Sequence, residues 1–146
     1  MFHPVLDLAA TITFMVVIDT MQADYVMAFA RHIRPHVDTE SQRAEAAERR
    51  GDSVPAFRHL ERTHVLGQAS TREHVRVHWH MLLWAMRHRE TREVHGQFVR
   101  LLGAATKTAF GLVPTGNTGG SDIRPCQRLP VPPDIAATIK AARSDD

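Results

Sequence analysis

The chain has 146 residues and a mass of 16.4 kDa, which is enough for one domain with a hydrophobic core but not for two. Its formal charge of only +2 comes from interleaved acidic and basic residues, which argues against a nucleic-acid surface, and 43% hydrophobic residues exclude general disorder. The single cysteine, Cys126, excludes an internal disulfide framework and fits a reducing cytoplasm, while the ten histidines are the outlier of the composition.

Residues 1–26 are expected to be a peripheral extension. Residues 8–18 form an apolar run that is too short to span a bilayer, so no membrane partner is expected. No lysine or arginine precedes Arg31, so the basic start of a signal peptide is missing. The segment could be an extra helix or strand, or translation from an upstream start, with Met27 as the alternative initiator.

The first helix of the domain is predicted over residues 35–50, with Pro35 in its first turn. Apolar residues continue its stripe upstream, so the helix could also begin earlier and contain a kink. At about 100° per residue, Glu40 falls inside the apolar stripe and His36 shares that side. A carboxylate and an imidazole are therefore expected to face the core.

The second helix is predicted over residues 53–66, between Gly51 and Gly67. Its Glu61 and His64 are spaced i, i+3, the Glu-x-x-His arrangement with which helix bundles direct a carboxylate and an imidazole at one ion. Both residues lie on the apolar side of this helix.

A capping box, Ser-Thr-Arg-Glu, opens the third helix, which is predicted over residues 71–88. His74 and His78 lie one turn apart in the middle of its apolar stripe, whereas His80 points to the opposite side. Burying two imidazoles costs free energy unless each has a partner, and a metal ion suits an i, i+4 pair. The sequence therefore predicts buried metal ligands on three successive helices.

The fourth helix is predicted over residues 91–106, because its apolar stripe is out of phase with that of the third helix. We expect Val94, Phe98, Leu101 and Ala105 to face the core. After Lys107 the chain becomes rich in glycine and proline, and this tail is expected to lie across the bundle and end in a short helix over residues 135–143. The GNTGG stretch at 116–120 lacks a following lysine and a preceding strand, so it is interpreted as a tight turn and not as a phosphate loop.

The predicted fold is all-α: a small antiparallel bundle of about four helices over residues 27–106, followed by the tail at 107–146. The stretches FRHLERTH (57–64), HVRVHW (74–79), GAATKT (103–108) and GNTGG (116–120) resemble an uncharacterised bacterial family, domain-of-unknown-function family 3703. The resemblance covers roughly residues 27–142 and leaves the N-terminal extension outside. It implies membership of that family but no activity.

Two functions fit the pattern. The first is a transition-metal-binding bundle, either a metalloenzyme or a metal-handling protein, with a buried site whose predicted ligands are Glu40, Glu61, His64, His74, His78 and, less centrally, His36. The ligand types suit Zn, Fe, Mn, Ni or Cu. The second is a scaffold of tetratricopeptide-like helical hairpins with a metal-free network, in which Glu61 accepts a hydrogen bond from His78 and Glu40 from His74. A homodimer is compatible with either.

Overall fold

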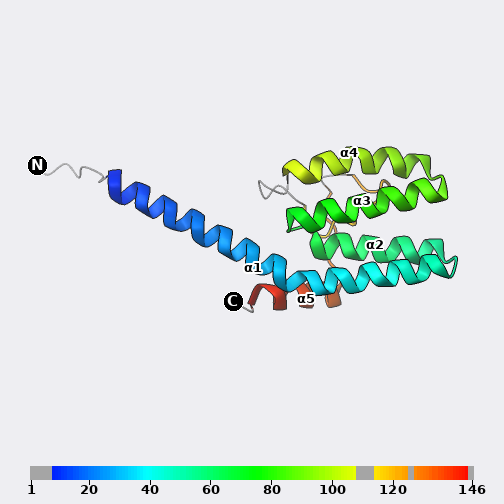
Figure 1. Ribbon diagram of the computed structural model, residues 1–146, viewed down its shortest axis with the longest axis horizontal. Coiled ribbons are helices and arrows are strands. Elements are labelled where there is room, and N and C mark those ends of the chain that lie inside the picture. Colours follow the sequence, from blue (N-terminus) through cyan, green and yellow to red (C-terminus); the bar gives the residue numbers. More distant parts are fainter. Residues whose placement is uncertain (1–7, 108–113, 125–126, 145–146) are drawn as a thin grey trace, which may run out of the picture.

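The protein is all-helical in the computed structural model, which describes residues 8–107, 114–124 and 127–144. Five helices occur there: α1 (Leu8–Arg49), α2 (Ser53–Gly67), α3 (Thr71–His88), α4 (Thr91–Lys107) and α5 (Pro133–Ser144). The C-terminal half of α1 lies beside α2, and α3 and α4 form the second layer (Figure 1). The expected bundle and the terminal helix are therefore confirmed. None of the described helices combines the length and the hydropathy that a bilayer-spanning segment requires.

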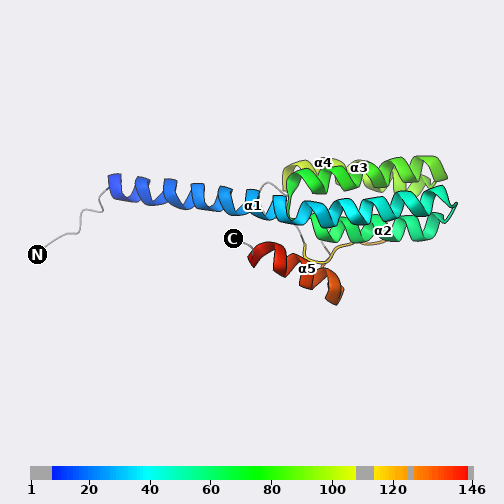
Figure 2. The ribbon, with the colours of Figure 1, turned by 60° about the horizontal axis from the view of Figure 1, so that its bottom comes forward.

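The first helix does not start near Pro35 but begins earlier, which is the alternative that the upstream apolar residues allowed. α1 begins at Leu8 and continues through Pro35, and its N-terminal part projects away from the bundle (Figures 1 and 2). Proline inside a helix removes one backbone hydrogen bond at a cost of about 3 kcal/mol. Ile33 and Val37, on either side of it, are completely buried, and we attribute the continuity of the helix to this packing.

Two apolar clusters hold the helices together. One joins α1 and α2 to α5, which packs across their outer side in Figure 2. The other joins α1, α2 and α3, where the rings of Phe57 and Trp84 lie 4.4 Å apart. Gly51 lies in the short connection between α1 and α2, and its φ of +81° lets α2 fold back against α1.

The predicted apolar stripe of α4 does not form the buried face. The buried residues on this helix are instead Glu93, Gln97 and Ala104, while Phe98 is 59% exposed. Val94 and Leu101 are partly buried, Val94 against the second cluster, and the side chain of Ala105 lies outside the described residues. α4 therefore turns a polar face inward, because that face bonds to the segment that crosses the bundle.

This crossing segment, residues 114–124, is called the strap below. Both carboxylate oxygens of Glu93 accept from the backbone N–H of Ser121, at 3.1 and 3.0 Å. The side-chain amide of Asn117 donates to the carbonyls of Arg124 and Gln127 at 3.0 and 2.8 Å, so one asparagine fixes the path of the turn. The GNTGG stretch is thus a turn packed on the bundle, as the sequence predicted.

Candidate metal centre

Three histidine side chains meet between α2 and α3. His64 lies near the end of α2, and the short connection to α3 places it opposite His74 and His78. The Nε2 atom of His64 is 2.9 Å from that of His74 and 3.1 Å from that of His78, and the latter two are 3.1 Å apart. All three residues are buried, with at most 7% of their surface exposed. This is the group of potential metal ligands that the described residues bring together.

The hydrogen-bond partners of Nδ1 determine which ring nitrogen carries the hydrogen in two of these histidines, His64 and His78. The Nδ1 atom of His64 is 2.8 Å from the backbone carbonyl oxygen of Asn117, and Nδ1 of His78 is 2.6 Å from Oε1 of Gln97. Both oxygens can only accept, so both Nδ1 atoms must donate. A neutral imidazole has a single N–H, so the Nε2 atoms of His64 and His78 carry lone pairs.

The amide of Gln97 is held in the orientation that this assignment needs. Its Nε2 donates to Oε1 of Glu93 at 2.6 Å and to the backbone carbonyl of Gly119 at 2.7 Å. Its Oε1 must therefore face His78. Gln97 and Glu93 thus form a buried chain of hydrogen bonds that ends on the imidazole.

Burial keeps the three imidazoles neutral. Desolvation lowers the pKa of His64 well below its usual range, and the neighbouring His78 and His74 lower it further. Desolvation, followed by the charge of His78, lowers the pKa of His74 to about 3. The pKa of His78 is lowered to about 4, although its hydrogen bond to Gln97 acts in the opposite direction. At neutral pH the nitrogens are available as ligands without first losing a proton.

The three Nε2 atoms therefore have too few hydrogens to form hydrogen bonds along all three of their contacts. His74 can place at most one hydrogen between the three rings. The Nε2 atoms of His64 and His78 carry no hydrogen, so these two atoms cannot form a hydrogen bond with each other. Two lone pairs 3.1 Å apart repel, and burying them without a partner costs free energy. A cation placed among them would satisfy all three.

The spacing also suits one ion. Two nitrogens bound at about 2.1 Å from a metal are about 3.0 Å apart when they subtend a right angle, and about 3.4 Å apart at a tetrahedral angle. The observed separations of 2.9–3.1 Å are close to the first value. The backbone carbonyl and the glutamine amide are the kinds of groups that orient metal-bound histidines in proteins.

The strap approaches the centre very closely at Gly119. This residue has a φ of +81°, and a Cβ atom there would lie 2.7 Å from Cδ2 of His64. Only glycine combines this backbone conformation with such a close approach to the ring. The strap thereby covers one side of the imidazole.

Glu40 and His36, which the sequence analysis placed at the site, lie elsewhere. Glu40 is buried as expected, but its carboxylate bonds to Arg43 at 2.7 Å, to His59 at 2.8 Å and to Arg62 at 3.3 Å. Although burial raises the pKa of Glu40, these hydrogen bonds and charges outweigh it and the pKa is lowered. Glu40 is buried against α2 because His59 and Arg62 of that helix face α1 and bond to it. His36 is exposed.

Glu61 is not part of the three-histidine group either, so the Glu-x-x-His spacing does not bring its two residues to one point. Burial raises the pKa of the Glu61 carboxyl, and the carboxylates of Asp122 and Glu93 add to the rise. The proposed metal-free pairs are not formed, because Glu40 bonds to His59 and the Nδ1 atom of His78 bonds to Gln97.

Sequence reasoning missed the residues that hold the imidazoles. Glu93 and Gln97 are spaced i, i+4 and so share one side of α4, which was a usable signal. The apolar stripe, centred about 90° around the helix, is the stronger signal in the sequence and points to a different face. Asn117 contributes a backbone carbonyl, which no side-chain pattern could identify.

Comparison with known proteins identifies a family. The family model described as "Protein of unknown function (DUF3703)" matches residues 31–139, which include the three histidines and the strap. No curated protein and no solved structure matches the chain significantly.

Proposed function

The chain belongs to the DUF3703 family of unknown function, and we propose that it binds one divalent transition-metal ion through His64, His74 and His78. The observation that carries this proposal is the convergence of three buried Nε2 atoms, two of which have their single hydrogen on the opposite nitrogen. A metal-free network would need those hydrogens between the rings. The alternative, a scaffold of tetratricopeptide-like helical hairpins, draws no support from the three-histidine centre.

The donor set narrows the choice of metal. Three neutral imidazoles suit Zn, Cu, Ni or Fe, whereas Mn prefers oxygen ligands. Structural zinc sites usually have four protein ligands, while three protein ligands leave a position for water or another molecule. The centre therefore fits a role in which the ion meets a further ligand, as in a metalloenzyme or a metal-handling protein.

When bound, such an ion would supply Lewis acidity to whatever occupies the remaining position. The protein's own groups have separate tasks. Gln97 and the carbonyl of Asn117 orient two of the rings, and the strap limits access of water to His64.

Elemental analysis tests this proposal directly. Protein purified without an affinity tag from ordinary medium should contain close to one transition-metal ion per chain. Metal-free protein should recover one equivalent and melt at a higher temperature when the ion is added back. Metal content near zero, together with no change in melting temperature on adding Zn, Cu, Ni or Fe, would contradict it.

A further inference from the structure

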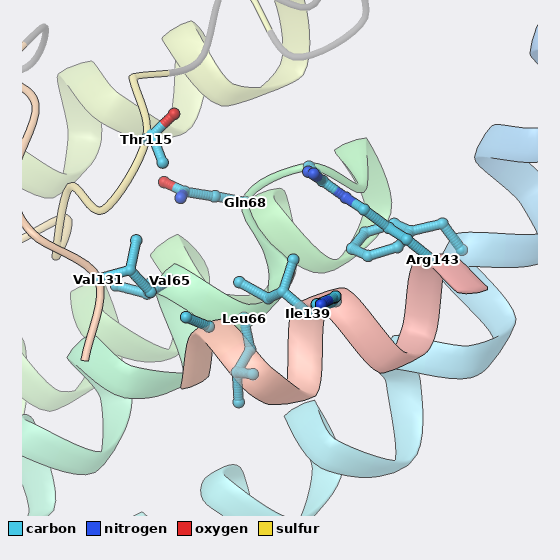
Figure 3. A pocket seen from close by; sticks show the side chains of 11 residues that line it. Val65, Leu66, Gln68, Thr115, Val131, Ile139 and Arg143 are labelled. Carbon is cyan, nitrogen blue, oxygen red and sulfur yellow. The ribbon is translucent and has the colours of Figure 1, made fainter. Parts of the chain in front are cut away.

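A cavity separate from the metal centre lies between α5, the end of α2 and the strap (Figure 3). Its volume is about 480 Å³, within the usual range of about 300–1,000 Å³ for small-molecule sites. Apolar side chains form most of its wall: Phe29, Val65, Leu66, Val131 and Ile139. In Figure 3 several of these side chains point into a common space.

The charged residues that line this cavity are all basic. Lys140 and Arg143 are spaced i, i+3 and so lie on the same side of α5. The guanidinium of Arg143 lies over the ring of Phe29, 5.7 Å from its centre, which holds the charge beside the apolar wall. Neither cation forms a salt bridge with any residue that the structure describes.

Two uncharged polar residues, Gln68 and Thr115, also line the cavity, and the amide of Gln68 is already hydrogen-bonded within the protein. The amide of Gln68, oriented to suit its neighbours, donates to the carbonyl of Pro114 and accepts from the N–H of Gly116, both at 3.1 Å. Gln68 therefore fixes the strap to α2, and the groups of the wall that remain for a ligand are the apolar side chains, Thr115 and the two cations.

We propose that this cavity binds a single-chain amphiphile with an anionic head, of which a medium-chain monocarboxylate is the simplest example. The aliphatic chain would lie against Val65, Leu66 and Ile139, and the head would pair with Lys140 and Arg143. Apolar burial supplies the affinity for the chain, and charge-assisted hydrogen bonds select the head. The inference does not depend on the metal centre.

Calorimetric titration of the full chain with decanoate, below its micelle-forming concentration, tests the proposal. One equivalent should bind saturably, and decyltrimethylammonium should not bind. Decyl phosphate serves as a second anion, and its affinity relative to decanoate distinguishes a fatty-acid source from a phosphorylated one. Because binding here is independent of the metal, metal-free and metal-loaded protein should give the same result.

Charge-reversal variants test whether the anionic head of the ligand binds at Lys140 and Arg143. Lys140→Glu and Arg143→Glu should each weaken decanoate binding about tenfold, whereas Arg92→Glu, an exposed change of equal charge on α4, should not. Circular dichroism checks that the variants are folded. Because Lys140 is exposed, the decanoate affinity of Lys140→Glu remains a valid test even if Arg143→Glu disturbs α5. Absence of saturable decanoate binding, equal binding of the cationic amphiphile, or equal affinity of Lys140→Glu and wild type would each overturn the proposal.

Discussion

At the three-histidine centre, the tautomers of His64 and His78 are set by the groups on the other side of their rings. His78 is the clearest case, since Gln97 accepts its Nδ1 hydrogen and is itself fixed by Glu93 and Gly119. The ability of Nε2 to bind an ion therefore depends on residues that never touch the ion.

Gln97→Leu should test this dependence. Leucine keeps the size of the side chain but removes the acceptor, so His78 would lose its fixed tautomer and orientation. We expect metal affinity to fall about 10- to 100-fold. Gln42→Leu, the same change at an exposed position of α1, should leave affinity unchanged. Competition titration with a chelating dye measures both, and equal affinities would show that Gln97 has no role in orienting the ring.

Gly119→Ala should damage the centre by a different route. A Cβ atom would press on the His64 ring, and alanine at a φ of +81° costs about 1–2 kcal/mol. Lower thermal stability and weaker metal binding should appear together. The comparison is Gly103→Ala on α4, where a Cβ meets nothing within 4 Å and the change should be harmless. If Gly119→Ala matched Gly103→Ala, the strap would not lie as described.

At the scale of the elements, helical periodicity predicted which residues share one side of a helix. It did not predict the pairs that residues form with another helix or with the strap. It placed His74 and His78 on one side of α3, and the short connection from α2 brought His64 to them. It could not show that Glu40 on α1 also pairs with His59 and Arg62 on α2. The buried polar face of α4 likewise depends on the strap, which lies 28 residues away at Ser121.

The N-terminal part of α1 gives a prediction at this scale. Residues 24–27 are exposed, whereas Ala28, Phe29 and Ile33 are buried in the bundle. A chain starting at Met27 should therefore keep cooperative melting and lose at most about 1 kcal/mol of stability. Chemical denaturation of both chains measures this. Loss of the cooperative transition would show that residues 1–26 belong to the folded core.

At the scale of the whole molecule, three buried neutral histidines link folding to pH. In the unfolded chain their pKa is about 6.5, and in the fold it is lowered. The unfolded state therefore binds more protons below pH ~6.5, and stability is lost as the pH falls from there toward the folded pKa values of about 4 for His78 and about 3 for His74. Each such group contributes at most about 1.4 kcal/mol per pH unit.

The melting temperature of metal-free protein should accordingly fall between pH 7 and pH 5. His74→Ala should show a smaller fall, because one buried group no longer takes up a proton on unfolding. His95→Ala, at an exposed position of α4, should behave like wild type. The same dependence on pH in all three proteins would contradict the assignment of buried, neutral rings.

The most direct test of the metal centre compares two histidines that are two residues apart on α3. Metal-free wild type, His78→Ala and His80→Ala are titrated with Zn²⁺ against a competing chelator, because only His78 belongs to the group of converging nitrogens. Wild type and His80→Ala should each bind one equivalent with similar affinity, and binding by His78→Ala should be weakened at least about 100-fold. Equal binding by His78→Ala and His80→Ala, or no binding by wild type, would contradict the account.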